Sequence, residues 1–149
     1  LHLPASDDGR REPWRILEEV GAAPSGPLGE HVAQVVAVRS RLAAMSDDEV
    51  AALHPVVAPD VTQERHLRPG ASDPTLILIR QGGGFGRAVR ADTALAALVD
   101  VADGELSVAQ IASAVSALMG LPGADAEALR ADLVAAARAL AGDGFLLLP

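Results

Sequence analysis

The run of residues 68–106 constrains the fold of this chain more than any other part of it. It reads RPGASDPTLILIRQGGGFGRAVRADTALAALVDVADGEL. The short apolar stretch 75–81 predicts a β-strand, because it is rich in Leu and Ile and is bounded by turn-forming residues. The glycines at 82–84 predict a tight turn, so we expect residues 86–90 to return antiparallel to that strand.

Helical patterns flank this hairpin on both sides. Apolar residues spaced along 28–42 predict an amphipathic helix, with Arg39 and Arg41 near its C-terminus, where the helix dipole favours cations. Ser46 and Glu49 predict a capping box for a second short helix that runs to about Leu53. The alternating stretch 61–67 predicts a strand with two mixed faces.

Three more helices are expected after the hairpin. Asp92 is expected to cap the first of them and Asp125 the third, while Ser107 and Gln110 form a capping box for the second. The second helix is expected to bury one face, made of Ile111, Val115 and Leu118. The apolar stretch 145–148 predicts a last strand. We expect it to pair with the hairpin, because an unpaired apolar edge promotes aggregation.

These elements predict an α+β protein, in which an N-terminal helical arm precedes a winged-helix-like domain. That domain would consist of an antiparallel hairpin, three helices and a closing C-terminal strand. The expected division is a connector or arm at 1–27, a helical segment at 28–56 and the winged-helix-like domain at 57–149. Within the arm, residues 14–20 fit either a helix or a strand.

Composition excludes several classes of function. The chain has no Cys, which excludes disulfides and thiolate metal sites, and one Trp, two Phe and no Tyr leave little aromatic surface for stacking a base or a cofactor. A net charge of −8 argues against non-specific binding to nucleic acid or anionic membranes. No apolar run approaches the ~18 residues of a membrane span, and the N-terminus lacks a signal-peptide pattern. Because the chain starts at Leu1 and not at Met, we expect an excised piece of a longer cytoplasmic protein, although processing would also explain this start.

No motif for catalysis, cofactor binding or metal binding stands out. The glycine-rich segment 81–86 lacks the Lys of a phosphate-binding loop, and the strand-like GRAVR that follows it does not suit a dinucleotide site, so a hairpin turn is the better interpretation. The four histidines have no metal-ligand spacing; His66 is the most interesting of them, because it lies among charged residues on a predicted strand. No Gly-x-Ser-x-Gly motif occurs.

The arginines are unevenly distributed. Residues 61–90 carry five Arg against Glu64 and Asp73, a local charge of +3, whereas the rest of the chain carries −11. The predicted partner-binding or substrate-binding residues are Arg65, Arg80, Arg87 and Arg90. They could dock an acidic neighbouring domain, contact another protein or reach nucleic-acid phosphates, or they could be plain surface. The helix 107–119 has no Arg, Lys or Asn, which argues against base reading through it.

Four segments carry a family resemblance by their order. They are PLGEHVAQ at 27–34, VAPDVTQERHLRPG at 57–70, DPTLILIRQGGGFGRAVRADTALAALV at 73–99 and DGELSVAQI at 103–111. Together they resemble the C-terminal, non-catalytic region of a family of S-adenosylmethionine-dependent methyltransferases of high-GC bacteria. The resemblance extends from about residue 14 to the end. The part from Thr75 onward is also similar to small peptide-binding winged-helix domains of peptide-modifying pathways.

The resemblance implies that a helical domain and a Rossmann-like catalytic domain precede this region in the parent protein. This chain would then be an accessory domain that packs on the catalytic domain or positions substrate through the hairpin arginines. S-adenosylmethionine would bind the parent protein, and no cofactor is expected in this chain. The methyl acceptor stays open between nucleic acid, protein glutamine and a small molecule.

Two other functions are compatible with the residues. One is a free-standing winged-helix module that binds a peptide or protein by strand addition, and the other is a nucleic-acid binder that uses the basic hairpin. An apolar strand or the N-terminal arm could also pair two copies as a homodimer. No membrane association is expected.

Overall fold

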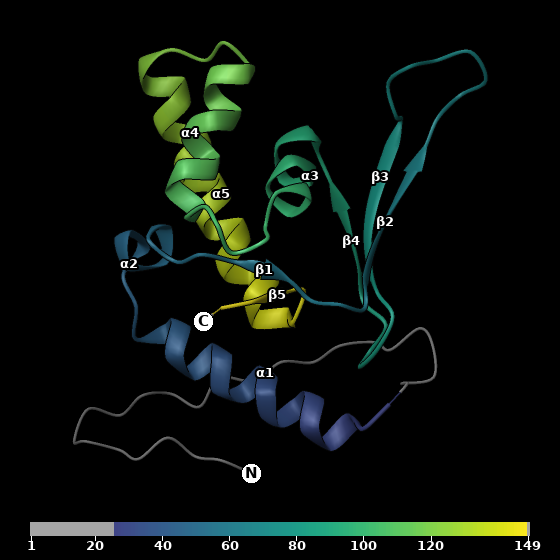
Figure 1. Ribbon diagram of the computed structural model, residues 1–149, viewed down its shortest axis with the longest axis vertical. Coiled ribbons are helices and arrows are strands. Elements are labelled where there is room, and N and C mark those ends of the chain that lie inside the picture. The colour runs from purple at the N-terminus through teal and green to yellow at the C-terminus, as the bar shows by residue number, and fades with distance from the viewer. Residues whose placement is uncertain (1–25, 149) are drawn as a thin grey trace.

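The computed structural model describes residues 26–148, which fold as an α+β protein with antiparallel sheets. The elements in chain order are α1 (Leu28–Ala43), α2 (Asp47–Ala51), β1 (Val56–Val57), β2 (Val61–His66), β3 (Leu76–Gln81), β4 (Ala88–Ala91), α3 (Thr93–Asp100), α4 (Val108–Leu118), α5 (Gly123–Asp143) and β5 (Leu146–Leu147). In Figure 1 the sheet lies beside α3, α4 and α5, and α1 crosses below them. The predicted connector, including the ambiguous stretch 14–20, lies outside the described residues, apart from its last two positions.

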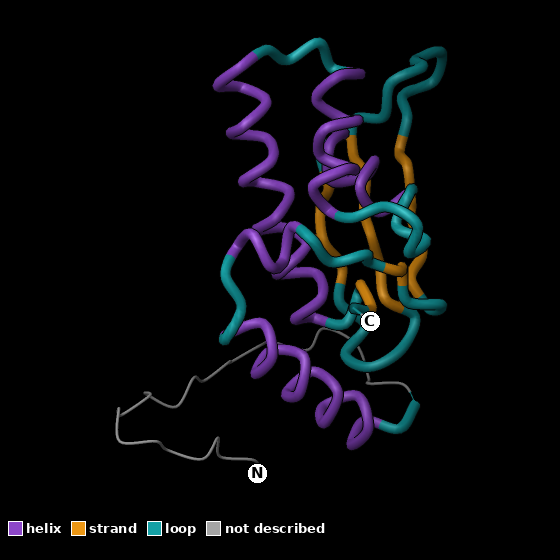
Figure 2. The backbone as a smooth tube through the Cα atoms, turned by 60° about the vertical axis from the view of Figure 1, so that its left-hand side comes forward, coloured by secondary structure: helices purple, strands orange, loops and turns teal. Residues whose placement is uncertain are grey.

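The predicted hairpin is confirmed and belongs to a three-stranded antiparallel sheet of order β2-β3-β4. Ile79 at its centre pairs with Gln63 on one side and Val89 on the other, which sets the register of both ladders. The turn 82–87 joins β3 to β4, as the glycine-rich sequence predicts. The loop 67–75 between β2 and β3 projects beyond the sheet in both views (Figures 1 and 2).

The expectation that the last strand pairs with this hairpin is wrong. β5 pairs antiparallel with β1 in a separate two-stranded sheet, with Val57 opposite Leu146. The physical reason is where α5 ends: the chain leaves that helix beside residues 56–58, and the amide of Ala58 donates to the carbonyl of Phe145 at 3.0 Å. The apolar stretch is thus paired, which protects its edge from aggregation. Its partner is β1, a segment whose sequence shows only a weak strand pattern.

The core is built around α5. This helix packs against α1, α2, α3, α4 and β5, and the sheet contributes Ile77 and Ile79 to the same core. Phe145 and Leu98 are 1% and 0% exposed, so these two large side chains are fully buried at the centre of an Ala-rich core. Burial of one such side chain stabilises the fold by roughly 1.5–3 kcal/mol. A few large side chains can therefore stabilise a core in which small residues fill the space between the helices.

The predicted helix starts are correct at three positions. Ser46 and Ser107 each form a complete capping box with the residue three positions on, and the Asp92 carboxylate accepts the amide of Leu95 at 2.8 Å. Asp125, however, is not an N-cap. The third helix of this group, α5, begins at Gly123 after Pro122, which places Asp125 in its first turn, where the helix dipole favours a carboxylate.

The prediction that Leu118 is buried is also wrong, since its exposed fraction is 86%. Leu118 is the last residue of α4, and the first residues of α5 opposite it are exposed as well. The two helices therefore extend beyond the core at this end, and no residue of the described part of the chain covers the side chain. Ile111 and Val115, one and two turns earlier, are buried as predicted.

The division into a helical segment and a domain from residue 57 stays a prediction. In the structure, Leu42, Val50 and Ala51 of α1 and α2 join the same hydrophobic core as the residues of α3–α5. Figure 2 shows α1 running below both the helices and the sheet. Among the described residues, no helix combines the length and the apolarity that crossing a membrane requires.

Candidate functional site

The structure does not gather the four predicted arginines into one patch. Cross-strand pairing places Arg80 and Arg90 on the outer face of the sheet, because Arg80 is opposite Thr62 and Arg90 is opposite Leu78. Arg65 lies on the other face and Arg87 lies in the turn before β4. The basic character read from the sequence is therefore divided over two faces of the sheet and its lower turn.

Three of these arginines already have partners. Arg65 pairs with Asp100 of α3 at 2.7 Å, and Arg80 pairs with Glu64 on the neighbouring strand at 2.9 Å. Both pairs are solvent-exposed, and such pairs contribute only about 0–1 kcal/mol, so a partner molecule can replace them. The side chain of Arg90 is exposed and forms no hydrogen bond or ion pair within residues 26–148.

The ion pair with Arg80 affects the ionisation of the Glu64 carboxylate. The hydrogen bond and the charge of Arg80 lower the pKa of Glu64 below its ordinary value, and His66 adds a smaller effect of the same sign. The Glu64 carboxylate therefore stays ionised at acidic pH values where an unpaired glutamate takes up a proton.

Arg87 has a structural role instead. Its guanidinium donates to the carbonyl of Asp143 at 3.1 Å and lies 5.0 Å from the ring centroid of Phe85. Arg39 of α1 reaches the same place from the other side and donates to the carbonyl of Gly142 at 2.7 Å. These carbonyls belong to the last turn of α5, which has no intrahelical donors for them, so the two arginines cap that helix and fix α1 and the β3–β4 turn to it.

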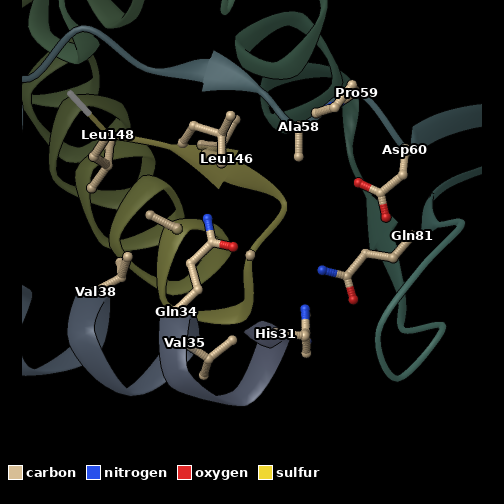
Figure 3. A pocket seen from close by; sticks show the side chains of 13 residues that line it. His31, Gln34, Val35, Val38, Ala58, Pro59, Asp60, Gln81, Leu146 and Leu148 are labelled. Carbon is tan, nitrogen blue, oxygen red and sulfur yellow. The ribbon is translucent and has the colours of Figure 1, made fainter. Parts of the chain in front are cut away.

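A cavity of about 460 Å³ opens beside this junction. Its lining residues are His31, Gln34, Val35, Val38, Ala58, Pro59, Asp60, Gln81, Ala141, Gly144, Leu146, Leu147 and Leu148. The volume lies within the range of small-molecule sites. Figure 3 shows that the polar side chains converge from α1, from β3 and from the segment before β2, while β5 and α1 supply apolar walls.

Gln81 is the most deeply buried polar group of this cavity. It is 4% exposed, and its Nε2 donates to the carbonyl of Asp143 at 2.8 Å. This bond fixes the orientation of the amide, because the reverse orientation would bring two oxygens together. Its Oε1 is buried and has no hydrogen-bond partner among the described residues. A buried acceptor without a partner costs about 1–3 kcal/mol.

His31 provides a second buried polar atom without a partner. Its Nε2 makes no hydrogen bond within the described part of the chain. The ring lies edge-on to Phe85, with 5.4 Å between ring centroids. A Cβ atom added to Gly144 would lie 3.5 Å from His31 Cε1 and 3.4 Å from Gln81 Nε2, so both side chains approach the same point above that glycine.

Asp60 adds a negative charge at the exposed rim of the cavity. Its Oδ2 accepts the amide of Gly83 at 2.8 Å, and its carbonyl accepts the amide of Gly82 at the same distance. The aspartate thus holds the glycine-rich turn against the segment that precedes β2. Among the lining residues, only Asp60 and His31 are ionisable.

Sequence reasoning missed this cavity. His31 and Gln81 lie fifty residues apart, and nothing in their local sequence distinguishes them from surface residues. His66, which the sequence favoured, is exposed and lies 3.6 Å from Glu64. Within residues 26–148 no three His, Asp or Glu side chains lie close enough together to share a metal ion.

Comparisons with protein-family models and with curated protein sequences find no match for this chain.

Proposed function

We propose that this chain is an accessory domain of an S-adenosylmethionine-dependent methyltransferase, which packs on the catalytic domain or positions its substrate and transfers no methyl group itself. The proposal includes the winged-helix-like interpretation, in which a hairpin precedes three helices. The proposal rests on one observation: four segments, in this order, resemble the C-terminal region of such enzymes.

The arrangement of those segments supports the proposal. The segment 57–70 contains β2, the segment 73–99 contains β3, β4 and α3, and the segment 103–111 begins α4. They follow one another along the chain with gaps of only a few residues, and they form one packed unit, because β2 pairs with β3 and β3 with β4, and α3 packs on β4 and α4.

The outer face of the three-stranded sheet is the docking surface in this proposal. It presents the half-buried Leu76 and Leu78 with Arg80 and Arg90 beside them. An apolar centre with arginines at its side is typical of protein interfaces, where Arg is enriched. The surface of the docked catalytic domain would also supply hydrogen-bond acceptors for the guanidinium of Arg90. The resemblance implies that the catalytic domain of such enzymes carries two motifs, acidic-Gly-x-Gly-x-Gly and Asn-Pro-Pro-Tyr. This chain has neither motif, so none of its residues is assigned to methyl transfer.

Two measurements test the proposal. Sequencing the coding DNA upstream of Leu1 is expected to reveal an in-frame domain that carries both of those motifs. Titration of the isolated 149-residue chain with S-adenosylmethionine in a calorimeter is expected to show no binding. A start codon directly before Leu1, or micromolar affinity of the isolated chain for the cofactor, would contradict the proposal.

A peptide-binding module is the second candidate, and one observation favours it. β2 is an edge strand of the sheet, with β3 on one side and no further strand on the other among the described elements. An extended peptide could add to this edge through backbone hydrogen bonds. Backbone amide shifts confined to Val61–His66 on addition of a peptide would support this candidate. The nucleic-acid alternative has less support, because only Arg80 and Arg90 share a face of the sheet, and Arg80 is already paired with Glu64.

A further inference from the structure

We infer that the outer face of the three-stranded sheet binds an acidic segment of polypeptide through a carboxylate that lies between Arg80 and Arg90. Apolar neighbours of that carboxylate cover Leu76 and Leu78. The inference deepens the proposed docking surface, and it rests on the proposed function for the identity of the partner, which is then an acidic segment of the catalytic domain. It adds the chemistry of that segment and names a carboxylate of this chain that competes with it, Glu64.

The strand register makes the two arginines diagonal neighbours. Arg90 is directly opposite Leu78 and Arg80 is directly opposite Ala88, so the arginines lie two residues out of register on β3 and β4. Diagonal residues on one face of an antiparallel pair are roughly 7–8 Å apart, within reach of long side chains. Ala88 is small and exposed, which leaves space above β4 beside both arginines. Two guanidiniums can therefore donate to one carboxylate above Ala88.

Glu64 shows that this face already binds one carboxylate. Its Oε1 accepts from Arg80 Nε at 2.9 Å, and the two side chains are 40% and 44% exposed. On the other side of Leu78, the guanidinium of Arg90 is exposed and forms no hydrogen bond or ion pair among the described residues. A partner carboxylate that contacts both arginines gains a second charged donor, which Glu64 lacks. It can therefore displace Glu64, because exposed ion pairs are weak.

The composition of the outer face favours an acidic polypeptide over other partners. In a chain with a net charge of −8, this face carries two arginines and His66 against a single carboxylate, so it attracts negative charge. Leu76 and Leu78 are half-buried and offer an apolar strip along β3. The face holds no Phe, Tyr or Trp on which a nucleic-acid base could stack. A polypeptide supplies both the carboxylate and the apolar side chains next to it.

The probe that tests this inference is the pentapeptide Leu-Glu-Leu-Glu-Leu, acetylated and amidated so that its only charges are the two carboxylates. The ¹⁵N-labelled chain of 149 residues is titrated with it, and the side-chain Nε–Hε signals of Arg80 and Arg90 are followed by NMR. Both signals are expected to shift with one saturation curve. The same peptide with Gln in place of Glu is expected to bind about tenfold more weakly, the usual effect of losing a hydrogen bond to a charged group. Added salt is expected to weaken binding of the acidic peptide.

Two arginine variants separate this site from a general effect of charge. Arg90→Gln removes the second guanidinium and is expected to weaken binding of the acidic peptide about fivefold or more. Arg65→Gln is the matched control. Arg65 is also an exposed strand arginine, and it is paired with Asp100, but it lies on the other face of the sheet opposite Ile77. Its substitution changes the net charge equally and is expected to leave binding unchanged.

A third variant tests the competition by Glu64. Glu64→Gln removes the carboxylate that occupies Arg80 and is expected to tighten binding of the acidic peptide by up to about fivefold, which corresponds to the upper end for an exposed ion pair. A variant that failed to fold would lose binding, so damage to the fold cannot produce this gain.

Several results would overturn the inference: no saturable shift at Arg80 and Arg90, equal binding of the Gln peptide, or unchanged binding by Glu64→Gln. Shifts confined to the backbone of β2 would instead indicate strand addition, and tighter binding of a short oligothymidylate would indicate a nucleic-acid surface. Either result also overturns it. The proposed function is tested separately by the upstream coding sequence. The peptide can therefore fail to bind although a catalytic domain is found, or bind although none exists.

Discussion

The imidazole of His31 lies directly against the backbone of Gly84, so closely that a Cβ atom on this glycine would be 2.5 Å from His31 Cε1. This contact joins the first turn of α1 to the turn between β3 and β4, which lies more than fifty residues later. The adjacent Phe85 packs on the same ring. The helical arm is thus fixed to the sheet by a contact that only a glycine allows.

Gly84→Ala is expected to destabilise the protein by about 2 kcal/mol more than Gly86→Ala. Both glycines have nearly equal positive φ values, 58° and 61°, so both variants incur the same backbone strain. A Cβ atom on Gly86 would have no neighbour within 4 Å, whereas one on Gly84 displaces His31. Urea denaturation of both variants measures the difference, and equal stabilities would show that the contact with His31 is not tight.

Ser107→Ala is expected to cost about 1 kcal/mol of folding free energy. The Ser107 hydroxyl accepts the amide of Gln110, and the amide of Ser107 donates to the side chain of Gln110, so one substitution disrupts a complete capping box. Ser113→Ala on the exposed face of the same helix is the control, expected within about 0.5 kcal/mol of the parent chain. Thermal unfolding of the two variants distinguishes them. A similar loss of stability in both would contradict the capping role.

Leu133→Ala and Leu118→Ala remove the same atoms from opposite environments. Leu133 of α5 is 3% exposed, and its truncation is expected to cost about 2–5 kcal/mol through lost burial and the remaining cavity. Leu118 is 86% exposed, so its truncation is expected to change the stability by less than about 0.5 kcal/mol. Chemical denaturation measures both. A large loss for Leu118→Ala would instead restore the expectation that α4 buries this residue.

The Arg80–Glu64 pair predicts a specific pH dependence. Arg80 lowers the pKa of Glu64 in the folded protein, so the pair stabilises the fold above the ordinary glutamate pKa, and this contribution is lost as the pH falls through the lowered value. Arg80→Gln is therefore expected to raise the pKa of Glu64 in an NMR titration and to remove that part of the acid sensitivity. Arg90→Gln on the same face is the control, because Arg90 contacts no carboxylate among the described residues. An unchanged Glu64 titration in Arg80→Gln would refute the pairing.

The proposed docking surface makes a prediction that can be tested once the proposed parent methyltransferase is in hand. Arg90→Glu is expected to weaken the association of this domain with the catalytic domain at least tenfold, since it reverses a charge beside Leu78 at the centre of the outer face. Arg130→Glu makes the same charge change on α5, where Arg130 pairs with Glu127 and Asp48. Binding of the two separately produced domains, measured by calorimetry, distinguishes the variants. Equal effects of both would mean that the outer face of the sheet is not the contact.

Local sequence determined most of the elements of this protein. The apolar run before the glycines, the alternating stretch 61–67 and the two capping boxes each specify their structure through neighbouring residues, and each is observed. Turn chemistry and capping involve partners within a few positions, so the sequence displays both members of each interaction.

Tertiary structure decided the partner of the last strand, the exposure of Leu118 and the whole candidate ligand site. The apolar pattern of residues 145–148 specifies that a partner is needed, but not which one, and the end of α5 places it beside β1. Likewise, the helical period of α4 predicts that Ile111, Val115 and Leu118 share one face. It does not predict that the core ends before this face reaches Leu118. His31, Asp60 and Gln81 become neighbours only because α1, the β3–β4 turn and the end of α5 pack together, and such long-range packing leaves no trace in the residues next to them.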